Sequence, residues 1–238
     1  MANLLIEIGN TALKAAWSEG MTLGKTFRYQ GEKVIDYICS LTARERPDLM
    51  VVSCVYPLSA YDADRLSREC GKMVLLDGNH PQILGKYGLP AWLTYDRAAS
   101  ILAVRHLFQG RGCTLFDFGT TLTVDFIDAS GTYLGGNISP GCRTRFKALN
   151  KYSRSLPRIA TPEKTDPVGT SLEGSIASGV ISGILFEIEG YLALHPENVA
   201  VFTGGDANYF AKRMKNSIFA VCNLVLMGLS LIAEEYED

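Results

Sequence analysis

The chain has 238 residues, of which 47% are hydrophobic and 20% are charged. This composition excludes intrinsic disorder, and the length suits one large domain or two closely associated halves with a sizeable core. Its 23 basic and 25 acidic side chains leave a net charge of −2. That balance excludes a strongly basic nucleic-acid binder and gives no reason to expect a polybasic membrane anchor.

The first residues have no basic region, and Glu7 interrupts their apolar run, so they are not a secretory signal. The scattered cysteines form no Cys-x-x-Cys pair, which predicts reduced core thiols in a cytosolic protein. The three histidines stand alone, so a zinc site has almost no support. The uncharged stretch 216–233 contains polar residues and glycine, which predicts a buried strand, a turn and a helix rather than a membrane span.

A repeated segment organises the chain. Residues 6–11 read Ile-Glu-Ile-Gly-Asn-Thr, and residues 116–121 read Phe-Asp-Phe-Gly-Thr-Thr, with the two glycines 110 positions apart (119 − 9). In each copy an apolar alternation leads into a carboxylate, a glycine and small polar residues, and a further alternating segment follows at 12–17 and 122–127. Each copy therefore predicts a β-hairpin, with a third strand expected at 22–29 and at 132–134.

Helices and strands alternate after each hairpin. In the first half we expect helices at 32–44, 58–70 and 96–108, a buried strand at 49–55 and a further strand at 73–76. In the second half the four-residue spacing of Ile176, Val180, Ile184 and Ile188 predicts a long helix. Short buried strands at 199–202 and 218–221 are each followed by a helix. The order β-β-β-α-β-α thus occurs twice, which predicts two α/β halves, 1–112 and 113–238, with a cleft between them.

The two hairpin turns have the composition of phosphate-binding loops. Small residues let backbone N–H groups approach phosphate oxygens, and the carboxylate that begins each turn can hold a cation that bridges phosphates. Either turn alone is most simply a β-turn that contains glycine. The repeat of carboxylate, glycine and threonine favours the phosphate interpretation and predicts that both turns bind a nucleoside triphosphate.

Six motifs, in order along the whole chain, carry a family resemblance. Residues 7–11 resemble an Asp-x-Gly-Asn-Thr phosphate motif, with Glu7 in place of aspartate, and residues 117–125 resemble the second phosphate motif of the same family. The other four motifs lie at 87–97, 135–141, 203–207 and 223–229. The chain resembles the type III pantothenate kinases of the actin, sugar-kinase and heat-shock ATPase superfamily. The resemblance implies two similar actin-like (ribonuclease H-like) α/β halves with an ATP cleft between them.

The resemblance also implies a reaction and a set of site residues. The reaction is transfer of the γ-phosphoryl group of ATP to pantothenate, the entry step of coenzyme A synthesis, in a cytoplasmic homodimer whose pantothenate pocket lies at the subunit interface. The implied ATP contacts are Glu7, Ile8, Gly9, Asn10, Thr11, Ala12, Leu13, Lys14 and Thr120. The implied pantothenate contacts are Tyr87, Thr94, Tyr95, Asp96, Arg97 and Leu172. Asp96 would be the catalytic base, and Asp117 would hold K+ or NH4+, with Mg2+ accompanying ATP.

Two interpretations of Asp96 remain open at this point. A carboxylate beside a reacting hydroxyl can accept its proton, and Arg97 could orient that carboxylate or bind a substrate carboxylate. An aspartate just before a helix is also a common N-cap. Spacing alone favours the cap, whereas the surrounding motif favours the base. The glycines at 135, 136 and 141 are interpreted as ordinary turn residues, and His80 and Trp92 as structural.

Three departures from the family pattern support a competing function. Glu7 replaces aspartate, Thr94 replaces glycine, and Leu172 stands where a threonine is usual, with Thr170 nearby. A catalytically impaired homologue that binds nucleotide as a regulatory or structural protein is therefore the alternative. A third possibility is a small sugar or acid kinase of the same superfamily. Asp117, Asp96 and Arg97 are all retained, which favours the enzyme.

Overall fold

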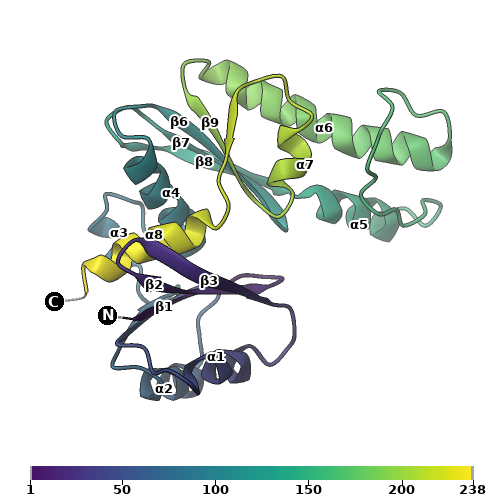
Figure 1. Cartoon of the computed structure of the whole chain (residues 1–238). Coiled ribbons are helices and arrows are strands. Elements are labelled where there is room, and N and C mark those ends of the chain that lie inside the picture. The colour runs from purple at the N-terminus through teal and green to yellow at the C-terminus, as the bar shows by residue number, and fades with distance from the viewer. Residues whose placement is uncertain (1, 237–238) are drawn as a thin grey trace. The chain divides into compact units, whose positions relative to one another are not determined.

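The computed structural model describes residues 2–236, which form two compact units. One unit contains the described residues up to Leu107 together with those from Asn223 onward, and the other contains Phe108–Cys222. Each unit is built on one five-stranded sheet (Figure 1).

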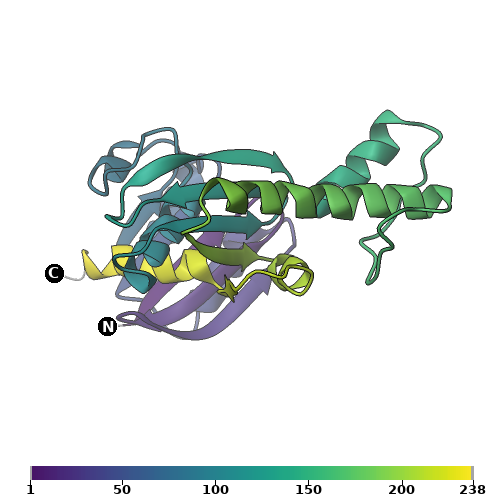
Figure 2. The ribbon, with the colours of Figure 1, turned by 90° about the horizontal axis from the view of Figure 1, so that it is seen from above.

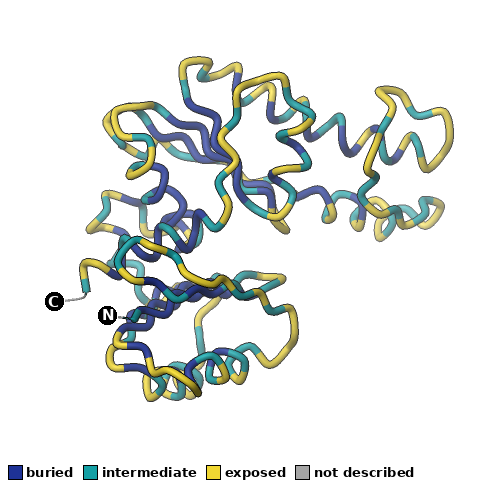
Figure 3. The backbone as a smooth tube through the Cα atoms, viewed as in Figure 1, coloured by how far each residue is buried: buried dark blue, intermediate teal, exposed yellow. Residues whose placement is uncertain are grey.

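The sheet of the first unit has the order β3-β2-β1-β4-β5. Its strands are β1 (Asn3–Ile8), β2 (Leu13–Glu19), β3 (Thr22–Tyr29), β4 (Leu49–Cys54) and β5 (Lys72–Leu76). β1 pairs antiparallel with β2 and parallel with β4. All residues of β1 and β4 are buried (dark blue in Figure 3), as expected of central strands covered on both faces.

Helices cover both faces of this sheet: α1 (Val34–Thr42), α2 (Ala60–Arg68), α3 (Gln82–Gly85), α4 (Tyr95–Leu107) and α8 (Leu224–Glu234). Ile38 of α1 and Leu66 of α2 share a core cluster with Leu4, Ile6 and Ile8 of β1. α8 contacts β1 from the opposite face and packs along α4 (Figure 1). Because side chains alternate along a strand, Glu7 projects from the face opposite Ile6 and Ile8, which is the face that α8 covers.

The backbones of α4 and α8 are in direct contact where the two helices cross. A Cβ atom placed on Gly228 of α8 would lie 1.8 Å from the carbonyl oxygen of Ala99 in α4. Only glycine fits this crossing, so the spacing between the two helices depends on a missing side chain.

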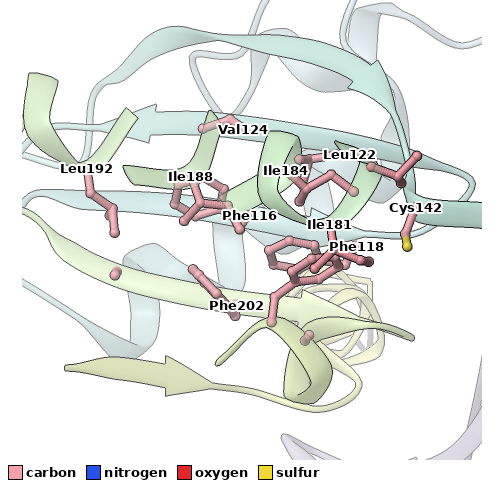
Figure 4. Packing of buried hydrophobic residues seen from close by; sticks show 14 of the residues in the cluster. Phe116, Phe118, Leu122, Val124, Cys142, Ile181, Ile184, Ile188, Leu192 and Phe202 are labelled. Carbon is pink, nitrogen blue, oxygen red and sulfur yellow. The ribbon is translucent and has the colours of Figure 1, made fainter. Parts of the chain in front are cut away.

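The sheet of the second unit has the order β10-β9-β6-β7-β8. Its strands are β6 (Cys113–Phe118), β7 (Thr121–Ile127), β8 (Tyr133–Pro140), β9 (Val199–Gly204) and β10 (Ile218–Ala220), and its helices are α5 (Cys142–Tyr152), α6 (Leu172–Leu194) and α7 (Ala207–Ala211). α6 lies along the sheet with α5 beside it (Figure 2). Ile181, Ile184 and Ile188 of α6 pack on Phe116 and Phe202 of the sheet (Figure 4).

The two sheets have the same connectivity, which confirms two similar α/β halves. In each, the first strand lies between an antiparallel hairpin partner and a parallel strand: β1 between β2 and β4, and β6 between β7 and β9. The units differ from the predicted halves, 1–112 and 113–238, in their bounds. The chain returns to the first unit at Asn223, which adopts left-handed backbone (φ 57°), so α8 completes the first unit and not the second.

Several local predictions need correction. Gly135 and Gly136 lie inside β8 rather than in a turn, and this strand runs to Pro140, well past the predicted 132–134. β10 is not buried, because Phe219 and Ala220 are exposed. α3 and α5 were not predicted, whereas α7 is the helix predicted to follow the strand at 199–202. The isoleucine stripe of α6 belongs to the core of the second unit.

All six cysteines are free thiols in the described residues. Cys54, Cys70, Cys113 and Cys142 are buried as predicted, but Cys39 is half-buried and Cys222 is exposed. Burial raises the pKa of the Cys54 and Cys113 thiols to about 11, so both are protonated at neutral pH.

Within residues 2–236, α6 is the single helix long and apolar enough to cross a membrane by length and composition. Part of that composition serves the core, because Ile176, Ile181 and Ile188 all face the core of the second unit.

Candidate functional site

The carboxylate of Glu7 lies at the end of the central strand of the first sheet. Its side chain is 11% exposed, and Lys14, its register partner across the hairpin, donates a 3.0 Å hydrogen bond from Nζ to Oε2. Burial raises the pKa of Glu7, the Lys14 charge opposes this, and the negative charge of Asp96 adds to it. Glu7 and Asp96 therefore lie within electrostatic reach of each other in the first unit.

The turn that follows Glu7 presents a small polar loop to solvent. Gly9 N–H donates to the Ala12 carbonyl oxygen at 3.1 Å and closes the turn, while Asn10 and Thr11 are exposed. A Cβ on Gly9 would lie 3.2 Å from the same carbonyl oxygen, so the turn favours glycine. The side chains of Ile8 and Leu13 lie in the core, so any ATP contact from these two residues is through the main chain.

Asp96 lies in the first turn of α4. The helix begins at Tyr95, and Ala98 N–H donates to the Thr94 carbonyl oxygen at 2.9 Å, so the N-cap interpretation of Asp96 is wrong. The Asp96 Oδ1 atom is buried and has no hydrogen-bond partner among the described residues. A buried carboxylate oxygen without a donor is costly unless it serves a ligand or a proton.

Arg97 and Trp92 form an aromatic–guanidinium pair beside Asp96. Arg97 is 5% exposed, and its guanidinium carbon lies 5.8 Å from the centroid of the Trp92 ring. The Trp92 ring is 64% exposed, so it is a surface ring and contributes no core packing. The pair keeps a positive charge fixed next to the catalytic candidate.

A buried carboxylate that the sequence analysis missed holds the start of α4. Asp77 is fully buried after β5 and accepts hydrogen bonds from Leu58 N–H (3.1 Å) and Asn79 N–H (3.0 Å). It also pairs with His80 Nδ1 at 2.8 Å. The Tyr95 hydroxyl in turn donates to the carbonyl oxygen of His80. Asp77 directly follows β5, the apolar strand at the edge of the first sheet, and that position was the available signal.

Tyr87 and Thr94, two of the predicted pantothenate contacts, lie in the same unit as Asp96. The Tyr87 hydroxyl donates a 3.0 Å hydrogen bond to Glu235, and burial and this carboxylate both raise its pKa. Thr94 is exposed, and among the described non-glycine residues only Asn223 has a positive φ. Threonine in place of glycine therefore imposes no backbone strain here.

The second unit contains a matching turn after β6. Gly119 N–H donates to the Thr121 carbonyl oxygen at 3.0 Å, as Gly9 does in the first turn. The Thr120 carbonyl oxygen accepts from Gly141 N–H (3.0 Å) and from the Thr144 hydroxyl (2.6 Å), which ties the turn to the start of α5. The Thr120 side chain itself is exposed.

Gly204 lies against Asp117, and Asp206 follows it two residues later; neither was assigned a role from the sequence. Gly204 pairs with Phe118 and has φ +92°, and a Cβ there would lie 2.3 Å from Asp117 Oδ1. Asp206 N–H donates to the Phe118 carbonyl oxygen at 3.3 Å, and burial raises the pKa of its carboxyl group, opposed by Arg143. The motif at 203–207 was visible in the sequence, but its proximity to Asp117 was not.

The donors around Asp117 suit a hard monovalent cation. Its carboxylate lies beside the main-chain carbonyl groups of the β6–β7 turn, and oxygen ligands are those that such cations take. No group of three or more His, Cys, Asp or Glu side chains able to hold a metal ion occurs within residues 2–236. A cation at this turn would therefore be held by Asp117 together with main-chain oxygens.

Leu172, the remaining predicted pantothenate contact, is the first residue of α6 in the second unit and is 51% exposed. Ser171 caps this helix, because its hydroxyl oxygen accepts from Gly174 N–H at 3.0 Å. Of the predicted pantothenate residues, the structure brings Tyr87 and Thr94–Arg97 into one unit and places Leu172 in the other.

Comparisons with known proteins agree with the family resemblance found in the sequence. The family model for type III pantothenate kinase matches residues 3–193. A type III pantothenate kinase from Phocaeicola vulgatus is 37% identical, over 99% of this chain and 99% of its own. Component A of (R)-2-hydroxyglutaryl-CoA dehydratase from Acidaminococcus fermentans has a similar fold (TM-score 0.61, 13% identity, 99% and 98% of the two chains). So does a ROK hexokinase from Thermus thermophilus (TM-score 0.53, 13% identity, 100% of both chains).

Proposed function

The chain belongs to the type III pantothenate kinase family, and we propose how its own residues carry out that activity. The family activity is an ATP-dependent phosphotransfer, with pantothenate as acceptor and a divalent metal accompanying ATP. One observation carries the proposal: the Asp96 Oδ1 atom is buried and has no hydrogen-bond partner in residues 2–236. Asp96 also precedes Arg97 in the chain, and its charge acts on Glu7.

Asp96 is the general base. A hydroxyl that attacks phosphorus loses its proton in the reaction, and a carboxylate oxygen within hydrogen-bond reach can accept it. Oδ1 has no competing donor in the described protein, so it is available to the acceptor hydroxyl of pantothenate. The Tyr95–His80–Asp77 hydrogen bonds hold the first turn of α4 and thereby fix where Asp96 lies.

Arg97 binds or orients the negative charge of the acceptor. Pantothenate carries a carboxylate, and a guanidinium group fixed by an aromatic ring suits such a charge better than a mobile lysine does. Tyr87 and Thr94 lie on the same unit and supply further pantothenate contacts.

The two hairpin turns bind the phosphates of ATP. Gly9 N–H and Gly119 N–H are both used to close their turns, so the contacts come from the exposed residues between: Asn10, Thr11 and Thr120. Glu7 is one methylene longer than aspartate, and its ion pair with Lys14 holds the carboxylate in place. The Lys14 side chain remains 33% exposed, so its ammonium group adds a positive charge beside this turn. Asp117 would hold K+ or NH4+, which would neutralise phosphate charge during transfer.

The protein forms a cytoplasmic homodimer through the second unit. Phe186 of α6 and Ile138 of β8 are 69% and 61% exposed, which is unusual for such large apolar side chains. Light scattering on Phe186→Glu should then show monomers where the parent shows dimers. A parent that is monomeric at micromolar concentration would contradict this contact.

An assay of ADP release with and without pantothenate, in potassium buffer, tests the activity. Pantothenate-dependent ADP release supports the kinase. ATP binding without any transfer would support instead the alternative of a nucleotide-binding regulatory or structural homologue. Transfer to sugars but not to pantothenate would support a small-molecule kinase of different specificity.

A further inference from the structure

The residues that follow α8 pack against the segment that precedes α4. Glu235 ends α8, with its N–H donating to the Ile232 carbonyl oxygen, and Tyr236 N–H donates to the Ala233 carbonyl oxygen at 2.9 Å. Both bonds span three residues, so Glu235 and Tyr236 form a tight turn at the end of α8. α8 itself is fixed on α4 by the close approach at Gly228.

Two lysines from elsewhere in the first unit hold Tyr236. Lys72 donates a 2.7 Å hydrogen bond to the Tyr236 carbonyl oxygen, and its ammonium nitrogen lies 5.4 Å from the centroid of the tyrosine ring. The Lys86 nitrogen lies 5.3 Å from the same centroid. Two ammonium groups near one ring make this docking specific, because each cation–π contact adds to the hydrogen bond.

Glu235 binds the hydroxyl group of Tyr87, and α4 binds the main chain of Tyr87. Glu235 Oε2 accepts the Tyr87 hydroxyl at 3.0 Å. Arg105 of α4 donates to the Tyr87 carbonyl oxygen at 2.8 Å. The main chain and the phenol of Tyr87 are thus both tied to the helix pair that presents Asp96, and the next residue, Gly88, takes the positive φ (+64°) that the chain needs to turn here.

We propose that Glu235 is a positioning residue for the acceptor substrate: its carboxylate sets the orientation of the Tyr87 phenol relative to Asp96. This inference rests on the proposed function, because it takes Tyr87 as a pantothenate contact. Glu235 is not one of the proposed ATP contacts, and its side chain bonds Tyr87. We therefore expect its loss to weaken binding of the acceptor and to leave the chemical step and the nucleotide site unchanged. A hydrogen bond to a charged acceptor at an exposed site such as this one corresponds to about a 3- to 10-fold effect on binding.

Steady-state kinetics on Glu235→Ala test the proposal. We expect KM for pantothenate to rise about 3- to 10-fold, with kcat and the KM for ATP within twofold of the parent. Glu235→Gln keeps an acceptor oxygen for the phenol and should restore most of the affinity. Glu234→Ala is the matched control, because it removes the same charge one residue earlier from an exposed side chain that does not contact Tyr87.

A double-mutant cycle with Tyr87→Phe separates positioning from general stability. If Glu235 acts through the phenol, adding Glu235→Ala to Tyr87→Phe changes KM no further. Additive effects, equal KM values for the Glu235→Ala and Glu234→Ala variants, or a parallel rise in the KM for ATP would each overturn the proposal while the kinase activity stands. A parent protein with no pantothenate-dependent turnover would overturn the proposed function, and this inference with it.

Discussion

Replacing Asp96 with asparagine separates catalysis from structure. Asparagine keeps the size of the side chain and one oxygen but cannot accept the proton of the attacking hydroxyl. Loss of a positioned general base lowers the rate about 10²–10⁴-fold, which raises the activation barrier by about 3–5 kcal/mol. We expect single-turnover transfer to pantothenate to fall by this factor.

Fold stability should change far less. Asp96 Oδ1 has no partner to lose among the described residues, and Asp96 is not the N-cap of α4. The change removes a favourable charge from the first helical turn, worth about 0.3–1 kcal/mol, and also relieves repulsion with Glu7. These effects oppose each other, so thermal melts should shift by no more than about 4 °C in either direction.

Asp62→Asn is the matched control, because Asp62 occupies the first turn of α2 and has no place in the site. It should retain full transfer activity. ATP binding should survive in both variants, since neither touches the phosphate turns. Normal turnover by Asp96→Asn would refute the general-base assignment, and a collapsed melt would show that Asp96 is structural.

Three further changes have defined outcomes. Burial raises the pKa of Glu7 above its ordinary value of 4.5. Protonated Glu7 therefore contributes its full share to the free energy of unfolding below about pH 4.5, and that share is lost as the pH rises through the raised pKa. Glu7→Gln should therefore melt above the parent at about pH 8, converge with it toward pH 4, and transfer phosphate more slowly. Exchanging potassium for sodium or a bulky organic cation should depress turnover strongly, and unchanged rates would remove Asp117 from cation binding. Gly228→Ala should lower the free energy of unfolding by about 1–3 kcal/mol in denaturant titrations, because the added Cβ would overlap the Ala99 carbonyl oxygen. Gly190→Ala is the control: its Cβ would meet open space, so this change should not destabilise the fold.

The repeated hairpins were predictable because their signal is local. Alternating apolar residues, a carboxylate and a glycine turn lie within a dozen consecutive positions, and strands paired through so short a turn form next to each other. The predicted third strand at 22–29 matches β3, and the long helix carrying Ile176 and Ile188 is α6. The identical order of the two sheets follows from the same repeat.

Other features required the tertiary structure. Helix propensity could not show that the segment after Asn223 packs on α4 rather than on the second sheet, since an apolar helix suits either core. The surroundings of Asp96 are equally non-local: Glu7 lies 89 positions earlier (96 − 7), and Asp77 acts on the first turn of α4 through His80. Glu235 meets Tyr87 across 148 positions. Sequence periodicity reports the face of each element that is buried, whereas the partners of a polar side chain depend on how those faces pack together.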